Sequence, residues 1–114
     1  MSILQMLKIV ALLLTLATGL LSLVKPKAVF GFTGLIAEGA RGISEIRAVL
    51  GGLFIGLGAA PLILGVPAAY QVIGIGYLAI GIARTFSILF DKSFAPSNLI
   101  SLAVEIVFGA ILVM

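Results

Sequence analysis

The chain has no cysteine and no histidine, and few of its residues are charged. Without these two residue types it cannot form disulfides, use thiolate chemistry or bind metal or haem through imidazole, so we expect neither a metal site nor a cofactor. Charged residues make up 10% of the 114, whereas an average soluble domain is about one quarter charged. A nucleic-acid surface would need many more clustered basic side chains than the seven present, so we expect no nucleic-acid partner.

Hydrophobic residues are abundant instead, at 62% of the chain. Long apolar runs predict four membrane-spanning helices, at about residues 3–24, 44–64, 68–90 and 98–114. Four spans of about 20 residues use most of the chain. We therefore expect one all-α domain, residues 1–114, that forms an integral membrane four-helix bundle. Lys8 before the first run is reminiscent of a secretory signal, but no clear cleavage pattern follows, and we expect a retained span.

The segment between the first two spans, residues 27–42, is too long for a tight hairpin and too apolar for a solvated loop. As a helix it would have a polar face with Lys27 and Arg41 and an apolar face with Phe32 and Ile36, which is typical of a helix lying in the membrane interface. Its glycines are poor helix formers and favour a short re-entrant segment instead. The sequence leaves both alternatives open.

Small residues recur at helical spacing in the first two spans. In the first span they predict a seam that lets a neighbouring backbone approach closely: Ala11, Thr15, Gly19 and Ser22. The second span has Gly51 and Gly58 on one face, and Gly52 and Gly56 on another in the spacing of close helix crossings. We therefore expect the second span to be contacted on both sides.

Ionisable residues lie inside three of the predicted spans. A charge in hydrocarbon costs roughly 2.5–3.5 kcal/mol on insertion scales, so these residues are expected to meet one another. At a rise of about 1.5 Å per residue they fall at similar depths near the inner leaflet. The predicted layer, either buried ion pairs or a ligand site, comprises Glu45, Arg47, Arg84 and Glu105, with Tyr77, Ser44 and Ser101 as hydrogen-bond partners.

Most basic residues fall on the side where the first and third spans end, whereas Lys8 lies on the other side. The excess of basic residues in cytoplasmic loops then predicts that both termini are outside. On the inner side, Ser97 or Asn98 is expected to be the N-cap of the fourth span.

The stretch Ser44-Glu45-Ile46-Arg47-Ala48, followed by Gly51-Gly52, precedes a third span with an arginine and a fourth with a glutamate. In this layout the chain resembles small bacterial four-helix membrane proteins of the DoxX-like kind, and among them an uncharacterised group. The resemblance implies a bacterial inner membrane. DoxX is associated with a quinone-linked oxidoreductase as a small membrane subunit, so the resemblance also implies a place beside a larger membrane complex. It carries over no catalytic residue.

These observations favour a non-catalytic accessory or scaffolding subunit, or a self-associating bundle, whose partners are membrane lipids and a larger membrane complex or further copies of the chain. The alternative is a binding or transport module for a lipid, quinone or other lipophilic molecule at the Glu/Arg layer. A third class is an intramembrane enzyme with Glu45 and Glu105 as acid and base. It is disfavoured because Arg47 and Arg84 would keep both carboxylates ionised.

Overall fold

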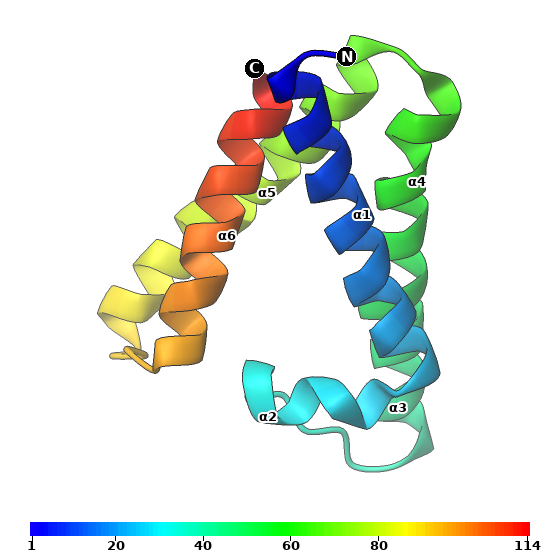
Figure 1. The fold of residues 1–114 in the computed structure, drawn as a ribbon. Coiled ribbons are helices and arrows are strands. Elements are labelled where there is room, and N and C mark those ends of the chain that lie inside the picture. The colour runs from blue at the N-terminus through cyan, green and yellow to red at the C-terminus, as the bar shows by residue number, and fades with distance from the viewer. The chain divides into compact units, whose positions relative to one another are not determined.

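A computed structural model describes residues 1–114 and contains helices but no strand. In chain order the elements are α1 (Ile3–Val24), η1 (Pro26–Val29), α2 (Phe30–Thr33), α3 (Ala40–Glu45), η2 (Ile46–Leu53), α4 (Phe54–Leu64), α5 (Pro67–Phe90) and α6 (Pro96–Val113) (Figure 1). Because α3, η2 and α4 run on without a break, they form one long helix, Ala40–Leu64. This helix and α1, α5 and α6 are the four that are long and apolar enough to cross a membrane, as the sequence predicts.

The chain divides into two compact units. One comprises residues 9–64 and is called here the α1–α4 unit. The other comprises residues 1–8 and 65–114 and is called the α5–α6 unit. The first residues of α1 belong to the second unit, where the Nε2 of Gln5 donates a hydrogen bond to the hydroxyl of Tyr70 at 3.4 Å.

In the α1–α4 unit, α1 packs against the helix Ala40–Leu64 through the predicted small-residue seam. All four seam residues are buried: Ala11, Thr15, Gly19 and Ser22. The helices approach so closely that a Cβ added to Gly19 would lie 2.9 Å from the backbone oxygen of Gly51, and one added to Gly58 would lie 3.0 Å from the side chain of Leu16. The glycine face predicted from Gly51 and Gly58 is therefore the face that receives α1.

The connection from α1 to α3 consists of short helical elements and a non-helical segment. α1 ends at Val24 because Pro26 has no N–H for a continuing helix and disfavours helical geometry at Lys25 (φ −127°, ψ 72°). The chain turns there, and α2 lies crosswise to α1 (Figure 1). α2 stops at Thr33 because Gly34 adopts a left-handed conformation (φ +77°) and caps the helix by donating its N–H to Phe30.

A continuous interfacial helix through residues 27–42 is therefore wrong. Residues 34–38 are not helical, and Gly39, with φ +108°, precedes the start of α3. The second membrane helix consequently begins at Ala40 rather than at the predicted Ser44. Its segment η2 is π-helical, a rare geometry that is frequent at functional sites and that the sequence pattern does not predict.

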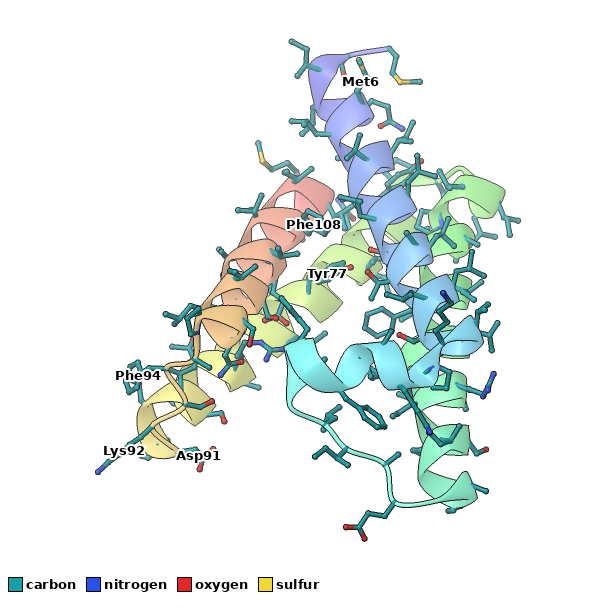
Figure 2. The ribbon with its side chains drawn as sticks, turned by 60° about the horizontal axis from the view of Figure 1, so that its bottom comes forward. Met6, Tyr77, Asp91, Lys92, Phe94 and Phe108 are labelled. Atoms are coloured by element: carbon teal, nitrogen blue, oxygen red, sulfur yellow. The ribbon has the colours of Figure 1, made fainter.

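In the α5–α6 unit, the two helices lie side by side (Figure 1). Glycines allow the close approach: a Cβ on Gly109 would lie 2.6 Å from Leu78, and one on Gly74 would lie 2.7 Å from Val113. The rings of Tyr77 and Phe108 meet edge to face between the helices, with centroids 5.6 Å apart (Figure 2).

The turn between α5 and α6 carries Asp91, Lys92 and Phe94 at one end of the helix pair (Figure 2). α6 begins at Pro96, whose fixed φ suits the first helical position, so Ala95 is the N-cap. The predicted N-cap at Ser97 or Asn98 is wrong, and the side chain of Asn98 is thereby available for another role.

Candidate functional site

Arg84 on α5 and Glu105 on α6 form an ion pair inside the α5–α6 unit. The Nε of Arg84 donates to both carboxylate oxygens of Glu105, at 2.7 Å to Oε1 and 3.0 Å to Oε2. Its Nη2 donates to Oε2 at 2.7 Å. Glu105 is buried, at 6% exposure, whereas the side chain of Arg84 is 31% exposed. The geometry is bidentate, the arrangement in which an arginine–carboxylate pair is strongest.

Asn98 extends this pair into a network that we call the Arg84 clamp, consisting of Arg84, Glu105, Asn98 and Ser93. The Nη1 of Arg84 donates to the Oδ1 of Asn98 at 2.7 Å. The Nδ2 of Asn98 in turn donates to the backbone oxygen of Ser93 at 3.0 Å and to its hydroxyl at 2.9 Å. The clamp thus joins α5, α6 and the turn between them. Asn98 lies two turns before Glu105 and therefore on the same helix face, a spacing that was visible in the sequence.

The clamp does not use every donor of Arg84. One N–H of Nη1 goes to Asn98 and one of Nη2 goes to Glu105. Because each terminal nitrogen of a guanidinium has two N–H groups, one on each remains outside the clamp.

The remaining predicted partners are distributed differently. Tyr77 contacts Phe108 in the α5–α6 unit. Ser101 is half-buried one turn before Glu105, on the same face of α6. Ser44 is exposed at the start of the second membrane helix. The structure therefore brings Arg84 and Glu105 together, with Ser101 beside them on the helix.

Glu45 and Arg47 have separate partners within the α1–α4 unit. Arg41 donates through Nη1 to Oε1 of Glu45 at 2.9 Å, and the two side chains are 82% and 56% exposed. An exposed pair of this kind contributes little to stability, about 0.3–0.5 kcal/mol. Helix Ala40–Leu64 starts early enough to place Arg41 one turn before Glu45, on the same face of the helix.

Arg47 lies in the π-helical segment and donates through Nη1 to the backbone oxygen of Leu23 at 2.6 Å. It therefore binds the carbonyl end of α1 rather than a carboxylate. Beside it is a hollow of about 590 Å³, lined by Lys25, Pro26, Lys27, Ala28, Ile43 and Arg47. We call this the basic hollow. The charged layer predicted from the sequence includes Arg47 but neither lysine, and Lys27 was expected on the polar face of an interfacial helix.

A protein-family model matches nearly the whole chain. The model of a family described as "Domain of unknown function (DUF4345)" matches residues 3–114. No curated protein and no solved structure matches the chain. These findings show no DoxX-like assignment.

Proposed function

The chain belongs to the DUF4345 family, and from that premise we propose that it is a non-catalytic accessory or scaffolding subunit of a membrane assembly, built as a four-helix bundle. The observation that carries the proposal is the Arg84 clamp. Both oxygens of Glu105 accept hydrogen bonds from Arg84, so this buried carboxylate is oriented toward its partner on the neighbouring helix. A carboxylate fixed in this way suits helix pairing better than proton transfer.

Two further features support association with other membrane helices. Gly52 and Gly56 occupy a face of the second membrane helix other than the face that receives α1, and close helix crossings in membranes use this spacing. The likeness to DoxX-like proteins in the stretch from Ser44 to Gly52 also favours a small subunit beside a larger complex. The partner is then another membrane protein or a second copy of the chain, in a bacterial inner membrane with both termini outside.

A second function is favoured by one specific observation. The terminal nitrogens of Arg84 each keep an N–H that the clamp does not use, and the side chain is about one-third exposed. These donors suit a carboxylate, a phosphate or a quinone oxygen of a lipophilic molecule. The alternative is therefore a binding or transport module for such a molecule, held at Arg84.

One pair of variants separates the two functions. The double variant Arg84→Gln/Glu105→Gln removes both charges and leaves neither stranded, so it is expected to fold. Arg41→Gln/Glu45→Gln makes the same two changes in the exposed pair and is the matched control. Each protein is purified in mild detergent, and native mass spectrometry reports the mass of the particle and any retained small molecule.

We expect wild type, double variant and control to form the same particle, heavier than one chain. A wild type that is monomeric and free of partner chains contradicts the accessory role. A lipophilic molecule that is retained by wild type and by the control, but lost from the folded double variant, supports the alternative instead.

A further inference from the structure

We infer that the basic hollow binds the phosphodiester of an anionic phospholipid at the membrane surface. The inference concerns the α1–α4 unit and is independent of the clamp, which lies in the other unit. It rests on the position of the hollow, on its charge and on the way in which Arg47 is held.

The hollow lies where a lipid headgroup would be. α1 ends at Val24, directly before Lys25, and the helix Ala40–Leu64 begins on the same side, with Ile43 and Arg47 in its first turns. The end of one span and the start of the next meet at a single membrane surface. Lysine and arginine at this level contact phosphates of the headgroup layer.

The charge of the hollow has one sign. Its lining includes Lys25, Lys27 and Arg47 but no carboxylate. Glu45, the nearest acidic residue along the helix, is paired with Arg41. No salt bridge joins any of the three lining cations to an acidic side chain. An anion that enters the hollow therefore meets three positive groups without competition from a protein carboxylate.

Arg47 is held in place for such a ligand. Its Nη1 is fixed by the carbonyl of Leu23, at the point where Gly51 allows the helices to approach so closely that an added Cβ would be 3.0 Å from Leu23. The remaining N–H groups of the guanidinium are not used by this bond, and a planar guanidinium matches the oxygens of a phosphate. The two lysines add positive charge to the same lining.

The size and the apolar lining favour a lipid over a small ion. A volume of about 590 Å³ is within the range of small-molecule sites, about 300–1,000 Å³, and exceeds what one phosphate ion fills. Pro26, Ala28 and Ile43 provide apolar walls beside the cations. A phosphodiester with its glycerol and the first carbons of its acyl chains would use both parts of this lining.

The test measures lipid binding to the full chain in detergent, by native mass spectrometry in a buffer without phosphate. Dioleoyl-phosphatidylglycerol is titrated against dioleoyl-phosphatidylcholine, which carries the same acyl chains without net charge. We expect wild type to prefer the anionic lipid. Lys25→Gln/Lys27→Gln should weaken its binding about twenty-fivefold, at about fivefold for each basic residue near the surface. Arg47→Gln should weaken it about tenfold because the oriented guanidinium is lost.

The matched control is Lys8→Gln/Lys92→Gln, which removes the same charge from two side chains outside the hollow and leaves the Arg41–Glu45 pair intact. Control binding within about twofold of wild type supports a site, whereas an equal loss in the control and in the lysine variant would show diffuse attraction and overturn it. Because Lys25 and Lys27 are exposed, their variants also keep the test decisive if Arg47→Gln fails to fold. Displacement of the lipid by millimolar inorganic phosphate would assign the hollow to a free phosphate and overturn the lipid assignment.

Discussion

Arg84 and Glu105 are joined by three hydrogen bonds from one guanidinium to one carboxylate, two of them 2.7 Å long. The pair links α5 to α6. The other buried residues of these two helices are glycines and apolar side chains. An unpaired charge inside a membrane has a high free-energy cost, and each residue of the pair lowers that cost for the other. The pair therefore contributes to holding the two helices in register.

Asn98→Ala should destabilise the α5–α6 unit, because it removes the acceptor of Arg84 and the donor to Ser93 together. The loss of hydrogen bonds to a part-buried charged network is expected to cost about 1–3 kcal/mol, measured as a lower midpoint of thermal unfolding in detergent. Ser93→Ala is the control, since the backbone oxygen of Ser93 still accepts from Asn98. Equal midpoints for Asn98→Ala and wild type would show that the asparagine is not part of the clamp.

Two glycines of the α1–α4 unit should respond in opposite directions to alanine. A Cβ on Gly19 would lie 2.9 Å from backbone atoms of Gly51 and Ile55, so Gly19→Ala must push the helices apart and should cost about 1–3 kcal/mol. A Cβ on Gly56 has no neighbour within 4 Å. Within the single chain, Gly56→Ala should therefore leave stability unchanged or raise it by about 0.5–1 kcal/mol through better helix propensity. Thermal unfolding of the two variants side by side measures both effects, and a destabilising Gly56→Ala would show that a partner helix packs on this face, as the proposed association expects.

The orientation can be read by labelling, because the chain has no cysteine of its own. Single cysteines at Ser2, Glu38 and Lys92 are introduced, and intact cells are treated with an impermeant thiol reagent. The distribution of basic residues predicts labelling at position 2 only. Labelling at positions 38 and 92 with none at position 2 would reverse the proposed orientation.

Much of the helical framework could be predicted because it follows from repeating physical rules. Apolar length marks each span, and small residues at helical spacing marked the buried seam of α1, including Thr15 and Gly19. The approach of Arg84 and Glu105 followed from depth along two neighbouring helices, at about 1.5 Å per residue. Span length, residue spacing and depth each follow from the order of residues within one helix. A single sequence therefore shows them directly.

The parts that were missed depend on local geometry. Gly34 and Gly39 adopt positive φ, which divides the expected interfacial helix, and a glycine in a sequence does not reveal which conformation it takes. The π-helical segment departs from regular helical spacing, so the backbone partner of Arg47, Leu23, could not be derived from that spacing. The pairing of Glu45 with Arg41 has the i, i+4 spacing of neighbours on one helix face, which the sequence shows.

A double-mutant cycle on the Arg84 clamp tests its structural role most directly. Unfolding is measured for wild type, Glu105→Gln, Arg84→Gln and the double variant in the same detergent. Removing one partner of a buried pair is expected to cost about 3 kcal/mol, because the remaining charge is stranded. The double variant should recover part of that loss, which would give a coupling energy clearly different from zero. A Glu105→Gln variant that unfolds at the wild-type temperature, with additive effects in the double variant, would contradict the account.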